Sequence, residues 1–308
     1  MVNLTKDYTV TTETVKENTM ENFINELFDI VTDRFNGIVT MHEVIKNNEA
    51  LTGFTFRRTE DQKIAPTLYP QSCFNRYENG DTTLDEIADD MIEMVERELE
   101  TNLDVDLSDF TEWDKVKANV VPVVISKETN AEMLKNLAYT DTKTDLAIVY
   151  NIVLKDFDDG GHASVKITKE IKEKLNVTMT EIKKYAFANA KESMECESMG
   201  KVLAELMGDD MLEMDNGMWV LSNKSKVNGA GVMFVPSVMR EVAKTVKLKE
   251  FFILPSSIHE VLVVTLPDAK ADELKAMVMD VNATQVAPRD RLSDSVYYYD
   301  GKNVTKVA

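Results

Sequence analysis

The sequence predicts an α+β fold, in which a mixed or mainly antiparallel sheet is covered by helices. Amphipathic stripes with helical spacing alternate along the chain with short apolar runs that are typical of strands. Several of these runs are joined by tight polar turns, and such hairpins argue against a purely parallel sheet. A chain of 308 residues is long enough for two domains, which we expect at residues 1–117 and 118–308.

The first domain is predicted to be a smaller, N-terminal helix-hairpin-helix part. Its first helix carries apolar residues at three-four spacing, and Gly37 is expected to end it in the left-handed conformation. Two short strands, at 53–58 and 64–69, flank a polar turn and indicate the hairpin. The second helix begins at Thr83, because Glu86 stands at capping-box spacing from it. The apolar stripe of this helix is Leu84, Ile87, Met91, Met94 and Val95.

The second domain alternates strands and helices. An Asp-Gly turn between two apolar runs predicts a hairpin within 146–167. A helix begins at Thr178, with Glu181 at capping-box spacing, and another helix follows at 238–246. The expected strands are residues 120–125, 146–154, 162–167, 218–221, 231–235, 251–254, 261–264, 296–299 and 303–306.

Composition excludes several classes of protein. A formal net charge of −19 with 44% hydrophobic residues indicates a folded chain whose surface is acidic. Direct binding of nucleic acid is disfavoured, because phosphate contacts need clustered lysine and arginine. No apolar run is long enough to span a membrane, and the first twenty residues lack the apolar core of a signal peptide. The two cysteines suit a reducing compartment, so we expect a cytoplasmic protein, with its oligomeric state left open.

The sequence predicts neither a cofactor nor a metal site. A Gly-x-Gly-x-x-Gly turn and a Walker loop are both absent from the chain. His259-Glu260 resembles part of the zinc-protease helix, but Val263 stands where the second histidine is required. The three histidines and two cysteines have no spacing that favours a transition metal.

Acidic residues are concentrated in one part of the chain. Residues 78–114 contain fifteen acidic residues and one basic residue, Arg97, and so carry −14 of the total charge of −19. On the helix that begins at Thr83, carboxylates outside the apolar stripe should form one face. This face is either a solubilising surface or a site that attracts a basic protein, or one that imitates the phosphates of a nucleic acid. The candidate binding residues are Asp85, Asp89, Asp90, Glu93, Glu96 and Glu100.

Macromolecule binding through this face is the favoured prediction, and a hydrolase-like enzyme is the alternative. The turn between strands 251–254 and 261–264 holds the side chains of a nucleophile and a base, and Asp156 or Asp294 could supply an acid. No Gly-x-Ser-x-Gly elbow is present, and a hydrogen bond that orders the turn is the simpler role for its histidine. The candidate catalytic residues are Ser256, Ser257, His259 and Glu260.

Five segments spread over most of the chain are similar to a known family. They are residues 52–56, 64–69, 145–150, 253–261 and 292–300. Together they resemble an uncharacterised family of gut-dwelling Gram-positive bacteria that is known as a domain of unknown function, and the Pro-Ser-Ser-Ile-His-Glu string is the most specific element. The resemblance implies a cytoplasmic bacterial protein that mobile elements can carry. It supplies no established activity and no catalytic residues.

Overall fold

The structure is a computed structural model, and its described residues form two compact units. The described residues are 12–46, 49–62, 65–100, 112–156, 162–208, 217–255 and 257–308. Unit 1 comprises Met1–Lys46 and Ala50–Asp104, and unit 2 comprises Asn47–Glu49 and Val105–Ala308. Both contain helices and sheets, and the pairings that are defined are antiparallel. The predicted α+β class is therefore confirmed.

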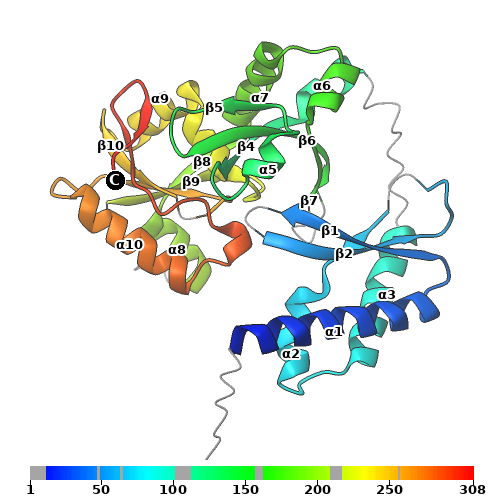
Figure 1. The fold of residues 1–308 in the computed structure, drawn as a ribbon. Helices are drawn as coiled ribbons and strands as arrows, with labels where there is room; N and C mark the ends of the chain where they lie inside the picture. Colours follow the sequence, from blue (N-terminus) through cyan, green and yellow to red (C-terminus); the bar gives the residue numbers. More distant parts are fainter. Residues whose placement is uncertain are drawn as a thin grey trace, which may run out of the picture. The chain divides into compact units, whose positions relative to one another are not determined.

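Unit 1 consists of three helices, one 3₁₀ turn and a three-stranded sheet (Figure 1) in the part of it that the structure describes. The strands lie in the order β1-β2-β3, and β2 pairs with β3 antiparallel. Strand β1 has no counterpart among the predicted elements. The elements are α1 (Thr12–Arg34), β1 (Ile38–Lys46), β2 (Glu49–Arg57), β3 (Thr67–Leu68), η1 (Pro70–Cys73), α2 (Phe74–Glu78) and α3 (Leu84–Glu100).

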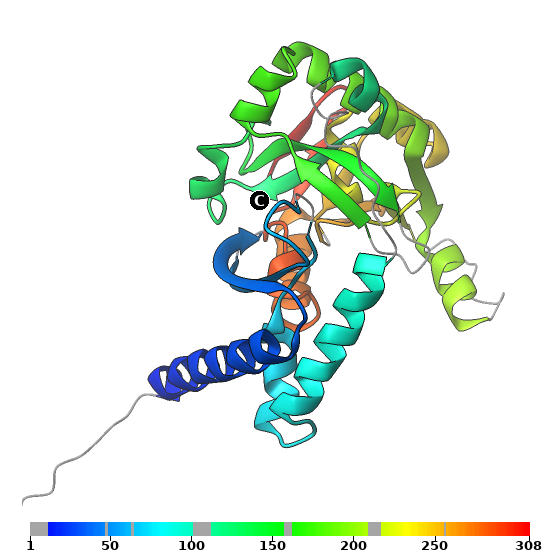
Figure 2. The same ribbon diagram turned by 90° about the vertical axis from the view of Figure 1, so that its right-hand side faces the viewer.

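The core of unit 1 forms where α1 lies beside α3 (Figure 2). Both helices bury residues at three-four spacing, and β2 adds two phenylalanines to the same cluster. The ring centroids of Phe35 and Phe56 are 5.2 Å apart in an edge-on arrangement. The buried residues of α1, β2 and α3 are Phe23, Ile24, Leu27, Val31, Phe54, Phe56, Ile87, Ala88, Met91 and Val95.

Gly37 follows the end of α1, but its role differs from the prediction. Its φ lies outside the left-handed region. A Cβ at this position would lie 2.3 Å from the backbone oxygen of Arg57 and 2.6 Å from the ring of Phe35. Glycine is required here because two backbones approach closely, rather than because of an unusual backbone angle.

Unit 2 contains two antiparallel sheets. In the four-stranded sheet, β6 pairs with β4, β5 and β7. In the six-stranded sheet, the order is β13-β12-β10-β11-β9-β8. The strands are β4 (Val120–Ser126), β5 (Tyr139–Asp141), β6 (Leu146–Asp156), β7 (His162–Lys166), β8 (Met194–Ser198), β9 (Met218–Asn223), β10 (Phe251–Leu254), β11 (Val261–Val264), β12 (Tyr297–Tyr299) and β13 (Val304–Lys306).

The helices of unit 2 cover these sheets. The elements are α4 (Trp113–Val116), η3 (Lys117–Asn119), α5 (Ala131–Leu134), α6 (Lys169–Lys174), α7 (Met179–Ser193), α8 (Met199–Met207), η5 (Gly229–Phe234), α9 (Pro236–Thr245), α10 (Ala271–Thr284) and η6 (Pro288–Asp290). Helix α7 begins with the predicted capping box of Thr178 and Glu181.

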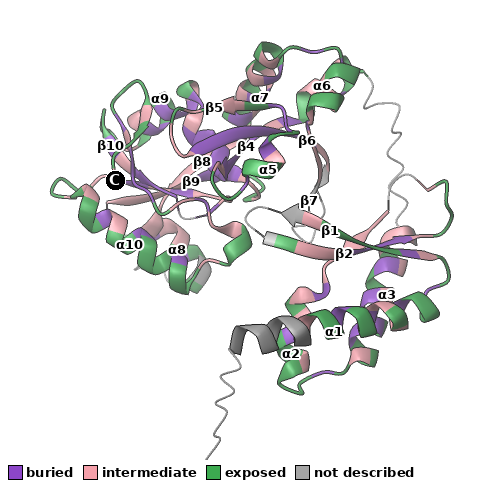
Figure 3. Ribbon diagram, viewed as in Figure 1, coloured by how far each residue is buried: buried purple, intermediate pink, exposed green. Residues whose placement is uncertain are grey.

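Alternation along the strands divides unit 2 into layers. On β6, Ile148 and Tyr150 face a large core that also contains residues of α7, α9 and β10, while Ala147 and Val149 face a smaller cluster with α5. Helix α10 packs on the outer face of the six-stranded sheet, where it contacts Leu254. Figure 3 shows buried residues along β6 and exposed residues on the outer side of α10.

One predicted strand is wrong. Residues 231–235 were expected to be extended, but most of them belong to the 3₁₀ helix η5. The segment is buried on all sides, and a short apolar run of this kind does not distinguish a strand from a buried helical turn. Gly231 approaches β4 so closely that a Cβ would lie 2.2 Å from the backbone oxygen of Pro122.

Candidate functional site

Helix α3 carries the candidate binding residues and begins with a reciprocal cap. The backbone N–H of Thr83 donates to Glu86 Oε2 at 2.9 Å, and the N–H of Glu86 donates to Thr83 Oγ1 at 3.2 Å. The predicted capping box is thus confirmed. Hydrogen bonds from the N–H and the hydroxyl of Thr83 lower the pKa of Glu86, so this carboxylate serves the start of the helix.

Three of the six candidate carboxylates are paired with arginines of the same unit. Arg34, at the end of α1, donates from Nη1 to Asp89 Oδ1 at 2.7 Å and also binds Asp85. Arg58, just after β2, binds Glu96. The hydrogen bond to Asp89, followed by that to Asp85, raises the pKa of Arg34. These contacts join α1 and the end of β2 to α3, and they neutralise half of the predicted acidic face.

Asp90, Glu93 and Met94 are exposed residues of α3 beside the paired carboxylates, and we call these three residues the α3 outer face. They are neighbours at helical spacing, and both carboxylates are exposed. Within the described residues, no lysine, arginine or histidine is recorded as an ion-pair partner of either one. The sequence placed Met94 in the buried stripe, but 44% of it is exposed, because it lies at the border of that stripe. The side chain of Glu100 lies outside the described residues.

The turn between β10 and β11 is held by Ser257 and Glu260. The backbone N–H of Ser257 donates to the carbonyl oxygen of Glu260 at 3.2 Å, and its hydroxyl donates to Glu260 Oε1 at 2.8 Å. The same hydroxyl accepts the N–H of His259 at 2.9 Å. Ser257 is buried, so this arrangement supplies partners for polar groups that water does not reach. The candidate residue Ser256 lies outside the described residues.

The imidazole of His259 faces away from the Ser257 hydroxyl. Its Nδ1 accepts the backbone N–H of Asn228 at 3.2 Å, which leaves the proton of the neutral ring on Nε2. Nε2 lies 3.5 Å from Asp290 Oδ1. The carbonyl oxygen of His259 accepts the hydroxyl of Ser222 at 2.7 Å. Ser257 and His259 are close in sequence. Among the described side chains, however, the imidazole of His259 lies beside the carboxylate of Asp290, and no serine hydroxyl is bonded to it.

A hollow of about 510 Å³ opens beside this turn. His259, Glu260 and Asp290 line it together with Lys226, and Lys226 is already paired with Glu195 at 2.6 Å. Sequence reasoning missed Asp290, because its approach to the turn depends on a hydrogen bond from the N–H of Ile258 to its carbonyl oxygen at 2.8 Å. Neither Asp294 nor Asp156, the two acids predicted as possible members of this site, is among the described residues that line it. Asp294 accepts a hydrogen bond from Asn282 at 2.7 Å, and the side chain of Asp156 lies outside the described residues.

Asp145, which the sequence did not single out, has four donors around its carboxylate. They are Tyr297 Oη at 2.6 Å, Ser295 Oγ at 2.7 Å, Ser293 Oγ at 2.9 Å and Lys306 Nζ at 3.1 Å. Burial alone would raise the pKa of Asp145, but these hydrogen bonds outweigh it and lower the pKa to about 2. Burial, followed by the hydrogen bond to Asp145, raises the pKa of Tyr297. The cluster joins the turn before β6 to the β12–β13 hairpin.

No group of three or more His, Cys, Asp or Glu side chains in the described residues is placed to hold a metal ion. No helix there combines the length and the apolar character needed to cross a membrane.

Comparison with known proteins identifies a family. The model of a family of unknown function, DUF5688, matches residues 13–301. No curated protein and no solved structure matches the chain. A match over nearly the whole chain agrees with the five segments that suggested a domain of unknown function, and the chain belongs to the DUF5688 family of unknown function.

Proposed function

We propose that the chain binds a basic protein partner through the α3 outer face. The observation that carries this proposal is the exposure of Asp90 and Glu93 beside Met94, with no recorded cationic partner in the described part of the chain. The neighbouring candidates are occupied, because Arg34 and Arg58 already neutralise them. The unpaired residues are therefore the better contact surface.

The α3 outer face suits a partner that presents lysine or arginine next to an apolar side chain. Exposed carboxylates accept charge-assisted hydrogen bonds from such cations. The flexible thioether of Met94 adapts its shape to an apolar neighbour. A basic amphipathic segment combines both features. Imitation of nucleic-acid phosphates has less support, because the pairs formed by Arg34 and Arg58 interrupt the row of unpaired charges.

The charge of the whole chain favours the encounter. A net charge of −19 attracts a basic partner from a distance and accelerates association. Salt screens this attraction, with a Debye length of about 10 Å at 0.1 M. Binding through the α3 outer face should therefore weaken steeply as the salt concentration rises.

The test is capture of partners from a lysate of the native host. The variant Asp90→Lys/Glu93→Lys reverses both unpaired charges. The control Glu128→Lys/Asp280→Lys reverses two exposed carboxylates of unit 2 and changes the net charge equally. Capture is measured in about 0.05 M and about 0.5 M salt, since screening changes strongly over this range.

We expect one set of basic proteins to be captured by the wild type and by the control in low salt. The same set should be lost with the α3 variant and in high salt. Capture that survives reversal of Asp90 and Glu93, or that the control variant abolishes equally, would contradict the proposal. Circular dichroism of each variant separates lost binding from lost folding.

A further inference from the structure

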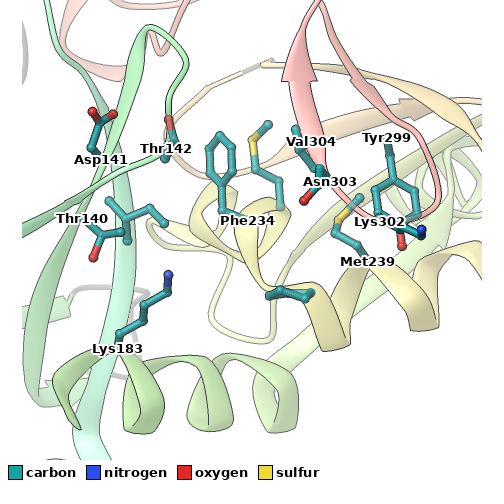
Figure 4. A pocket seen from close by; sticks show the side chains of 13 residues that line it. Thr140, Asp141, Thr142, Lys183, Phe234, Met239, Tyr299, Lys302, Asn303 and Val304 are labelled. Atoms are coloured by element: carbon teal, nitrogen blue, oxygen red, sulfur yellow. The ribbon is translucent and has the colours of Figure 1, made fainter. Parts of the chain in front are cut away.

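A pocket in unit 2 has the lining of a site for a small ligand. It has a volume of about 210 Å³ and lies among β5, α7, η5, α9 and the β12–β13 hairpin (Figure 4). All of its lining residues belong to unit 2, whereas the α3 outer face belongs to unit 1. Pockets for drug-sized ligands usually measure about 300–1,000 Å³. This smaller volume favours a ligand smaller than a nucleotide.

Lys183 is the distinctive residue of this pocket. It follows the buried Ile182 on α7, and Figure 4 shows its side chain reaching from the helix toward the pocket. Lys183 is partly buried, and its amine lies 5.2 Å from the centroid of the Phe187 ring. No carboxylate of the described residues is recorded within ion-pair distance of it. A partly buried cation with no recorded anionic partner can form an ion pair with a ligand that carries a negative charge.

Asp141, an acidic residue of the pocket lining, already has two hydrogen-bond donors. Asp141 Oδ1 accepts a hydrogen bond from Lys127 Nζ at 2.5 Å and another from the N–H of Lys143 at 2.9 Å. These two hydrogen bonds, that of Lys127 first, lower the pKa of Asp141. Lys127 thus neutralises the carboxylate of Asp141, and the charge of Lys183 remains available to a ligand.

The opposite wall adds a second cation and an amide. Lys302 and Asn303 lie in the hairpin turn between β12 and β13. Asp300 Oδ1 fixes this turn by accepting their backbone N–H groups at 2.8 Å and 2.7 Å. The side chains of both residues are exposed and are carried on an ordered turn of the pocket lining.

The remaining surface of the pocket is apolar. Met233, Phe234, Met239 and Val304 line it, and Met233 and Met239 are almost fully buried. A bare inorganic anion leaves this surface without a partner. An uncharged apolar molecule would leave Lys183 without an anionic partner.

We propose that this pocket binds a small organic carboxylate with an apolar body. Its carboxylate lies against Lys183, and its apolar body packs on Phe234 and Met239. Nothing in this assignment depends on the partner proposed for α3.

The test uses benzoate as the probe and methionine methyl groups as reporters in NMR. Met233 and Met239 line the pocket, whereas the exposed Met207 and Met279 serve as internal references outside it. Benzyl alcohol, which lacks the charge, and inorganic phosphate, which lacks the apolar body, are the comparison probes. The variants are Lys183→Gln, Lys183→Arg and, as a matched control on the same helix, Lys184→Gln.

Benzoate should shift the signals of Met233 and Met239 in a saturable way, with a dissociation constant on the order of millimolar for so small a ligand. Lys183→Gln should weaken binding about tenfold, whereas Lys183→Arg and Lys184→Gln should change it less than about twofold. Equal binding by Lys183→Gln, no shift of either reporter, or phosphate or benzyl alcohol binding as tightly as benzoate would overturn the proposal. Circular dichroism of each variant shows whether it remains folded.

Discussion

At the scale of single residues, Asp145 acquires its role from partners far along the chain. The sequence places Asp145 at the start of a predicted strand and Ser293, Ser295 and Tyr297 in another segment. Neither periodicity nor spacing predicts the contact between Asp145 and these three residues, because that contact depends on how the two sheets of unit 2 pack together. The structure shows their hydroxyl groups donating to one partly buried carboxylate.

This arrangement predicts a pH-dependent stability. The folded-state pKa of Asp145 is lowered from 3.8 to about 2, so its contribution is fully present above about pH 4 and is lost as the pH falls toward 2. Asp145→Asn should reduce the free energy of unfolding near neutral pH by on the order of 2 kcal/mol. The difference from wild type should shrink below pH 4.

Urea unfolding at pH 7, 5 and 3.5 measures this difference. The control is Glu128→Gln, which removes an exposed carboxylate between β4 and α5 and should leave the unfolding midpoint unchanged. A deficit of Asp145→Asn that stays constant from pH 7 to pH 3.5 would mean that the charge of the carboxylate is not what stabilises the fold.

The candidate turn shows a limit of sequence reasoning at the same scale. Ser257, His259 and Glu260 are close in sequence and lie in one turn, as the sequence indicates. Spacing does not determine which way each side chain points. The imidazole faces Asn228 and Asp290, two residues that only the folded chain brings to it.

At the scale of elements, short apolar runs were reliable where a partner strand lay nearby. The runs at 251–254 and 261–264 form β10 and β11, with Ile253 opposite Val263. The runs at 146–154 and 162–167 form the antiparallel pair β6 and β7. The segment 231–235 failed, because this largely buried 3₁₀ helix is as apolar as a strand and has no polar side chain to reveal its period.

The close approach of η5 to β4 predicts that a methyl group added at Gly231 lowers the free energy of unfolding. In Gly231→Ala the new Cβ would lie 2.2 Å from a backbone oxygen of Pro122, so a backbone must shift. We expect a loss of about 1–3 kcal/mol in the free energy of unfolding. Gly208→Ala has open space around it and a φ of +65°, so it should lose about 1 kcal/mol from backbone strain alone.

Urea unfolding of the two alanine variants compares these costs directly. Because both glycines belong to unit 2, the same transition reports on both. A Gly231→Ala variant as stable as the wild type would show that η5 can move away from β4 without loss of packing.

At the scale of the whole molecule, charge is the property that the sequence reveals best and localises least. The count of acids predicted one continuous acidic face on α3. The fold divides it, because Arg34 and Arg58 come from α1 and the end of β2 and bind only Asp85, Asp89 and Glu96 among the candidate carboxylates. The basic residues that neutralise a face are scattered in sequence, so only the packing of unit 1 identifies the unpaired part.

The central claim is that the paired and the unpaired carboxylates of α3 have different roles, and one comparison of two variants tests it. Asp85→Asn/Asp89→Asn removes charges bound by Arg34, whereas Asp90→Asn/Glu93→Gln removes charges of the α3 outer face. Urea unfolding and partner capture in low salt are measured on both variants. The first should lower the unfolding midpoint and retain capture, and the second should retain the midpoint and lose capture. If capture persists after Asp90 and Glu93 are neutralised, the account is contradicted.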